Sequence, residues 1–167
     1  LAPDPWDDYG ASKLEAEHLL HASGRKVVIF RAGAMFGHPA RESKFPDLAL
    51  QAALAGQCVT LATPPRCEDY LDVEQMARAL VRVCGDGPHW GRTFNITGPV
   101  RPLDGIVDAL NRACLAVLGR TVAVRRQPMP APIFPWLDVC RLHAFFPGLQ
   151  QPDDEAIFTR MLRARLA

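Results

Sequence analysis

The sequence has little that would bind a polyanion or enter a membrane. Its 19 basic and 18 acidic residues leave a net charge of +1, so charge gives no reason to expect nucleic acid as a partner. Only Lys13, Lys26 and Lys44 are lysines, and the arginines are scattered along the chain. No apolar run is long enough for a membrane-spanning helix. We therefore expect neither nucleic acid nor a membrane span among the partners of this chain.

The cysteines indicate neither a disulfide framework nor a zinc site. There are 5, an odd number, and no pair has the CxxC spacing of common zinc and thiol redox sites. His18 and His21 lie three residues apart but have no clear carboxylate or thiol partner, so we expect no metal. No signal peptide opens the chain, which favours a cytoplasmic location. The chain begins at Leu1 with loop-like residues, which suggests that it was cut from a longer protein.

Hydrophobic periodicity predicts helices that alternate with short strands. The expected helices cover residues 6–23, 47–55, 74–84, 103–118, 136–146 and 153–165. The expected strands cover residues 26–32, 58–62, 70–73, 93–97 and 122–126. On the first helix the predicted apolar stripe runs through Ala11, Leu14, His18 and Ala22. On the 74–84 helix it runs through Met76, Ala77, Leu80, Val81 and Cys84. Strands separated by crossover helices predict a parallel α/β sheet.

Tyr9 and Lys13 are the residues that most clearly indicate chemistry. Residues four apart on a helix lie on one face, one turn from each other. A phenol titrates near pH ~10, and a nearby ammonium favours the phenolate and lowers that pKa. Such a tyrosine can act as a general acid or base at a carbonyl or alcohol carbon. By itself the motif also fits a surface tyrosine stacked on a lysine side chain.

The sequence around this pair resembles the extended short-chain dehydrogenase/reductase family, which includes NAD-dependent epimerases and dehydratases. The family pattern YxxSKxxxE is matched by Tyr9, Ser12, Lys13 and Glu17. The pattern R-P-x-x-x-x-G at the end of the next strand is matched in part by Arg31, Ala32 and Gly37. Residues 68–74 and 94–98 resemble two later motifs of the family, in the same order. The resemblance covers residues 6–118.

The resemblance implies an NAD(P)-dependent oxidoreductase that moves hydride between a nicotinamide and a small-molecule carbonyl or alcohol substrate. Tyr9 would exchange the proton, and Lys13 would assist it and bind a ribose hydroxyl. Backbone groups of Gly33, Ala34 and Met35 would lie near the nicotinamide carboxamide, where a glycine lets the backbone approach a ligand closely. The cofactor is expected to be NAD or NADP, and the sequence does not choose between them.

Four residues are candidates for contact with the substrate. His38, Lys44 and Phe45 follow the strand that leads away from the predicted site, and Glu68 stands where nucleotide-sugar enzymes of the family have arginine. A carboxylate repels a pyrophosphate, so Glu68 argues against a nucleotide-sugar epimerase or dehydratase, although Arg66 could replace the missing arginine. That reaction remains the first alternative. A non-catalytic binding subunit with the same fold is the second.

The glycine-rich turn that holds a dinucleotide in this family does not occur in the chain. We therefore expect the C-terminal half of a Rossmann-like parallel sheet, with a small α-rich substrate-binding region. Residues 1–127 would form the catalytic part and residues 128–167 the α-rich substrate or lid region. Such a half is expected to be inactive alone, and to form a homodimer or join a chain that supplies the missing part.

Overall fold

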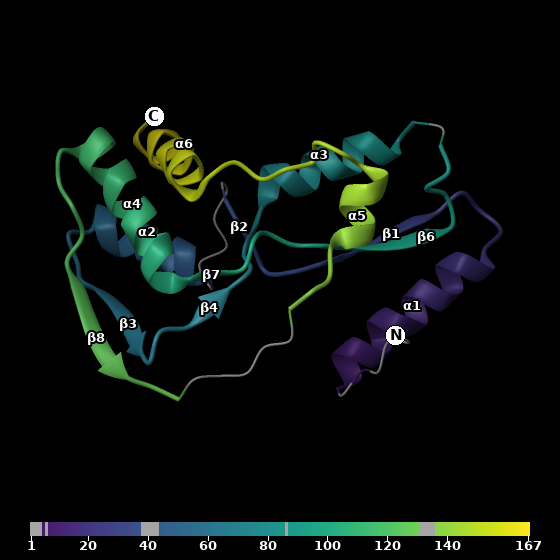
Figure 1. Ribbon diagram of the computed structural model, residues 1–167, viewed down its shortest axis with the longest axis horizontal. Helices are drawn as coiled ribbons and strands as arrows, with labels where there is room; N and C mark the ends of the chain where they lie inside the picture. Colours follow the sequence, from purple (N-terminus) through teal and green to yellow (C-terminus); the bar gives the residue numbers. More distant parts are fainter. Residues whose placement is uncertain (1–4, 6, 38–43, 86, 131–135) are drawn as a thin grey trace.

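The computed structural model describes residues 5, 7–37, 44–85, 87–130 and 136–167. In chain order the elements are α1 (Asp8–Ala22), β1 (Val28–Ala32), β2 (Met35–Phe36), α2 (Phe45–Leu54), β3 (Val59–Thr63), β4 (Cys67–Glu68), β5 (Leu71–Asp72), α3 (Val73–Val83), β6 (Arg92–Ile96), β7 (Arg101–Pro102), α4 (Leu103–Leu118), β8 (Val124–Pro128), α5 (Cys140–Phe145) and α6 (Asp154–Leu166). Figure 1 shows α2, α4 and α6 gathered beside β3 and β8, and α3 and α5 beside β1 and β6.

The predicted parallel pairing is confirmed for the longer strands. β1 runs parallel to β6, with Phe30 opposite Phe94, and β3 runs parallel to β8. The short pair β2 and β5 is also parallel, whereas β4 and β7 are antiparallel. Parallel neighbours need long crossovers, and the helices between these strands supply them.

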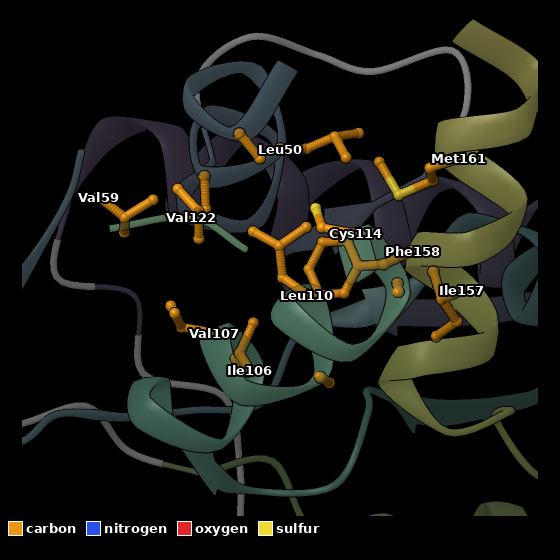
Figure 2. Close-up of a cluster of buried hydrophobic side chains, with 14 of the residues drawn as sticks. Leu50, Val59, Ile106, Val107, Leu110, Cys114, Val122, Ile157, Phe158 and Met161 are labelled. Atoms are coloured by element: carbon orange, nitrogen blue, oxygen red, sulfur yellow. The ribbon is translucent and has the colours of Figure 1, made fainter. Parts of the chain in front are cut away.

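One hydrophobic core lies between α2, α4 and α6. Leu110, Ile157 and Phe158 have no exposed surface, and Val59 and Val122 close the cluster from the strand side. Figure 2 shows Phe158 of α6 pointing between Leu110 and Cys114 of α4. The α4 helix ends at Gly119, whose φ of 69° is the left-handed conformation that favours glycine after a helix.

A second core covers one face of the β1–β6 pair. Phe94 and Ile96 of β6 are fully buried beneath Ala79 and Val83 of α3. The rings of Phe94 and Phe146 meet edge to face, with centroids 5.4 Å apart. Both cores combine residues from before and after residue 128. The boundary predicted there stays a prediction.

The helices lie where the periodicity predicts them, but two of the predicted stripes are wrong. The α1 helix buries no side chain, so the stripe through Leu14 and His18 is not part of a core. On α3 the buried residues are Gln75, Ala79 and Val83. Val81, part of the predicted stripe, is 74% exposed, whereas Met76 of the same stripe packs against the second core. The core therefore contacts another face of α3, and among the described residues no α1 side chain belongs to either core.

Two other predictions need correction. The nearly continuous apolar run of β1 is typical of a buried strand, but β1 buries only Ile29 and, among the described residues, pairs on one side alone. The predicted 136–146 helix is reduced to the short α5. All five cysteines are free. In the described part of the chain, no cluster of side chains could hold a metal ion and no helix is long and apolar enough to cross a membrane.

Candidate functional site

The α1 helix carries the predicted catalytic pair in its first turns. Asp7 caps it by accepting a hydrogen bond of 2.7 Å from the Gly10 N–H, so the helix begins just before Tyr9. The Lys13 ammonium lies 5.1 Å from the centre of the Tyr9 ring. The Tyr9 side chain is 72% exposed. The ammonium therefore lies over the ring of an exposed tyrosine, and the catalytic role of the pair stays a prediction.

A groove of about 1150 Å³ opens between α1 and the carboxyl end of β1. Tyr9 and Lys13 line it from the helix, and Gly33, Ala34 and Met35 line it from the strand end. The five residues that the family resemblance assigns to the catalytic pair and to cofactor binding therefore line one cavity. Because the carboxyl ends of parallel strands are the usual ligand-binding edge of such sheets, this position fits a bound small molecule.

The absence of a side chain at Gly33 also serves packing, and its role near the cofactor stays a prediction. A Cβ at this position would overlap the Thr97 side chain at the end of β6. The missing side chain is therefore needed for packing between the two strand ends. The Gly33 N–H donates a hydrogen bond to the Ile96 carbonyl, and the Ala34 carbonyl accepts one from the Leu71 N–H. A nicotinamide carboxamide would therefore have to bind other backbone groups of the 33–35 turn.

An ion pair connects α1 to β1 within the groove. Arg31 Nε and Nη2 donate to the two oxygens of Glu17, at 2.8 and 2.6 Å. The Arg31 hydrogen bond lowers the pKa of the Glu17 carboxyl, and the same bond raises the pKa of Arg31. Further along the helix, His21 Nε2 lies 3.3 Å from the Thr93 hydroxyl of β6.

The predicted substrate residues are not all brought to this cavity. Lys44 lines the groove, at the N-terminal end of α2. Phe45 packs instead against the core formed by α2, α4 and α6. Glu68 lies outside the groove lining and accepts a hydrogen bond of 2.6 Å from Arg66. His38 lies outside the described residues. The roles of these four residues in substrate binding stay predictions.

Two buried carboxylates were missed by the sequence analysis. Asp72 caps α3 through the Glu74 N–H, has no exposed surface and accepts a hydrogen bond from Arg160 of α6 at 2.6 Å. Asp47, in the first turn of α2, is also fully buried, and neither of its oxygens has a hydrogen-bond partner among the described residues. An Asp before a helix is a capping signal that could have found Asp72, but no sequence pattern marks the burial of Asp47.

The comparisons with known proteins agree with this geometry. Residues 2–97 match the model of the NAD dependent epimerase/dehydratase family. This match spans more than half of the chain. The chain belongs to this family. The search of curated proteins found no match.

Solved structures show the same fold over almost the whole chain. UDP-glucuronic acid 4-epimerase from Bacillus cereus, in complex with UDP-glucuronic acid and NAD, matches with a TM-score of 0.76 at 18% identity, covering 100% of this chain and 55% of that one. The NAD complex of dTDP-glucose 4,6-dehydratase from Bacillus anthracis gives 0.71 at 18% identity, covering 98% and 52%. RMD from Pseudomonas aeruginosa, complexed with NADPH, gives 0.72 at 21% identity, covering 98% and 57%.

At these identities the likeness establishes the Rossmann-like α/β fold alone, and the chain spans about half the length of these structures. The groove residues fit the nicotinamide end of such a cofactor. Lys13 offers an ammonium donor beside an accessible phenol, and the strand end opposite carries only small or flexible side chains at Gly33, Ala34 and Met35. The glycine-rich turn that would hold the pyrophosphate is not part of the 167 residues.

Proposed function

We propose that this chain forms the catalytic half of an NAD(P)-dependent epimerase or dehydratase in which Tyr9 is the general acid and base. The observation that carries the proposal is the meeting of Tyr9, Lys13 and the 33–35 turn at one groove. Family membership supports the same chemistry. A bound nicotinamide would accept and return hydride at the substrate carbon.

The protein side of the reaction is a proton transfer at the Tyr9 oxygen. The phenolate takes the proton of a substrate alcohol as the carbon gives up hydride, and the phenol returns it when a carbonyl is reduced. The Lys13 ammonium lies 5.1 Å from the centre of the Tyr9 ring and would supply a positive charge next to the reacting group. Lys13 can also donate a hydrogen bond to a ribose hydroxyl, which would hold the cofactor beside the phenol.

We propose a nucleotide sugar as the substrate class. The solved structures of similar fold include an epimerase with bound UDP-glucuronic acid, which supports this class. Glu68 was the sequence argument against it, but Glu68 is paired with Arg66 and lies away from the groove lining. Paired in this way, its carboxylate repels a pyrophosphate less than a free one would. Lys44 adds a cation to the groove, which suits an anionic ligand.

We also propose that a further segment completes the cofactor site by packing against α1 and β1. The α1 helix buries no side chain, and Leu19 and Leu20 are 66% and 48% exposed. Among the described residues β1 pairs only with β6, so its other edge is open. Open edges and unburied apolar helices are normally covered in a complete domain. The cover would come from the same polypeptide or from a second chain.

Isotope labelling in the full-length protein tests the reaction class. The substrates are UDP- and dTDP-sugars that carry deuterium on the carbon of a secondary ring alcohol, supplied with NAD. We expect product without net accumulation of reduced nicotinamide, with the deuterium retained in the sugar. Accumulation of reduced cofactor in proportion to product would show that the protein is a simple dehydrogenase and would contradict this proposal. Tight cofactor binding without turnover of any sugar would favour the non-catalytic alternative.

A further inference from the structure

Within the described residues, the α1 helix makes few contacts with the rest of the structure, although it carries the proposed catalytic pair. None of its side chains is buried, and none belongs to either hydrophobic core. In the described part of the chain, two side-chain interactions reach from it to the strands: the Glu17–Arg31 ion pair and the weaker His21–Thr93 contact. Among the described residues, these interactions link the helix that carries Tyr9 and Lys13 to the strands on the other side of the groove.

The Glu17–Arg31 pair has the geometry of a rigid connection. It is bidentate, so the flat guanidinium fork and the carboxylate fix both distance and orientation. The Glu17 side chain is only 15% exposed and that of Arg31 is 35% exposed, so water competes less than at an open surface.

The position of this pair connects the two sides of the groove. Glu17 is one helical turn beyond Lys13, which is itself one turn beyond Tyr9. Arg31 is two residues before Gly33, and both Glu17 and Arg31 are themselves among the residues that line the cavity. A shift at Glu17 would therefore move the phenol relative to the 33–35 turn.

We infer that the Glu17–Arg31 ion pair is a positioning device that holds the Tyr9–Lys13 pair at reacting distance from ligands in the groove. The inference rests on the proposed function of Tyr9. Glu17 and Arg31 need not touch the substrate or the cofactor in this role. Since a misplacement of about 1 Å can cost about a hundredfold in rate, loss of the pair should reduce kcat more than it weakens cofactor binding.

The test measures kcat, KM and cofactor Kd of Glu17→Gln in the full-length protein. We expect kcat to fall by about tenfold to a hundredfold with little change in Kd. Glu15→Gln is the matched control: it removes an equal charge from an exposed position of the same helix and should keep the wild-type kcat. The reversed pair, Glu17→Arg with Arg31→Glu, should recover most of the lost rate. Arg31→Lys keeps the positive charge but cannot make the two parallel hydrogen bonds of the guanidinium, so its kcat should fall as in Glu17→Gln.

Hydrogen exchange of the α1 amides separates this inference from the proposed function, because it needs no turnover. Faster exchange in Glu17→Gln than in Glu15→Gln, together with the loss of kcat, supports the positioning role. Wild-type kcat in Glu17→Gln overturns it, even if the helix exchanges faster. A reversed pair as slow as the single variant also overturns it, because Arg31 would then act directly on the ligand. If Tyr9→Phe retains full activity, the proposed function itself is wrong.

Discussion

At the scale of single residues, Asp47 is the most unusual group of the molecule. Its carboxyl has no exposed surface, and neither oxygen makes a hydrogen bond of good geometry to the described residues. Burial raises the pKa of Asp47 to about 6, although the nearby Gly37 N–H and the charge of Arg165 act to lower it. A buried carboxyl that ionises with so little compensation destabilises the fold at neutral pH.

Asp47→Asn should therefore stabilise the protein at neutral pH. Between pH 3.8 and about 6 the folded state keeps a proton that the unfolded state has lost, so stability falls as pH rises through this window. The asparagine variant does not ionise and should be more stable at pH 7 by up to about 3 kcal/mol, with little difference below pH 3.8. Urea denaturation at both ends of the window measures this.

The control is Asp108→Asn, an exposed aspartate of α4. It should change stability by less than about 0.5 kcal/mol at either pH. If Asp47→Asn instead destabilises the protein at pH 7, the ionised carboxyl has a stabilising partner in the folded state and the account of Asp47 is wrong.

Single residues also show what the sequence could predict about the site. Tyr9 and Lys13 were found because their relation is local: the four-residue spacing fixes it on any helix. Phe45 and Glu68 were assigned to the substrate because of their place in the chain. The contacts that decide their orientation come from the core of α2, α4 and α6 and from Arg66, and sequence spacing does not contain that information.

At the scale of elements, α6 is joined to the start of α3 by buried charge. Arg160 donates to Asp72 at 2.6 Å and lies 2.9 Å from Glu74, while Arg78 is 3.7 Å from the other oxygen of Asp72. Asp72 is fully buried, so its charge depends on these partners. Arg160 is the nearest of them.

Arg160→Ala should leave Asp72 with a buried and poorly compensated charge. We expect it to lower the free energy of unfolding by about 2 to 3 kcal/mol, because Asp72 would stay buried without the partner that offsets its desolvation. Arg163→Ala, an exposed arginine on the same helix, is the matched control and should cost less than about 0.5 kcal/mol. Equal stabilities of the two variants in urea would contradict this assignment.

Elements differ in how far the sequence could predict them. The α4 helix occupies the predicted residues 103–118, because it has apolar spacing along its length and Gly119 at its end. The α1 and α3 helices were also found, but the sequence did not predict which face of α3 is buried or that α1 buries no side chain. Their periodicity is a local property, whereas the buried face depends on which strands and helices come to lie against it.

At the scale of the whole molecule, the described residues form two hydrophobic cores and a groove at the carboxyl end of β1. Lys13 and the 33–35 turn line this groove, where we propose that the nicotinamide end of a cofactor binds. The solved structures that share the fold and bind NAD are about twice as long. The parallel topology was predictable from the order of elements. The sequence also predicts an incomplete cofactor site, because it lacks the glycine-rich turn, and this stays a prediction.

The isolated 167-residue chain should therefore bind NAD or NADPH only weakly. Without a glycine-rich turn to hold the pyrophosphate, we expect no saturation below about 1 mM in a calorimetric titration. A dissociation constant near about 1 µM would show that the chain alone forms a complete cofactor site. In that case the proposal of a further segment over α1 and β1 fails.

The catalytic role of Tyr9 is the claim on which the account depends, and one substitution tests it most directly. Tyr9→Phe removes the phenol oxygen and keeps the ring that packs beside Lys13. In the full-length protein the variant should bind the cofactor almost as tightly as wild type and lose at least about a hundredfold in kcat, since positioned acid–base groups contribute rates of this size. Glu15→Gln, exposed on the same helix outside the groove lining, should keep wild-type turnover. Wild-type turnover by Tyr9→Phe would contradict the account.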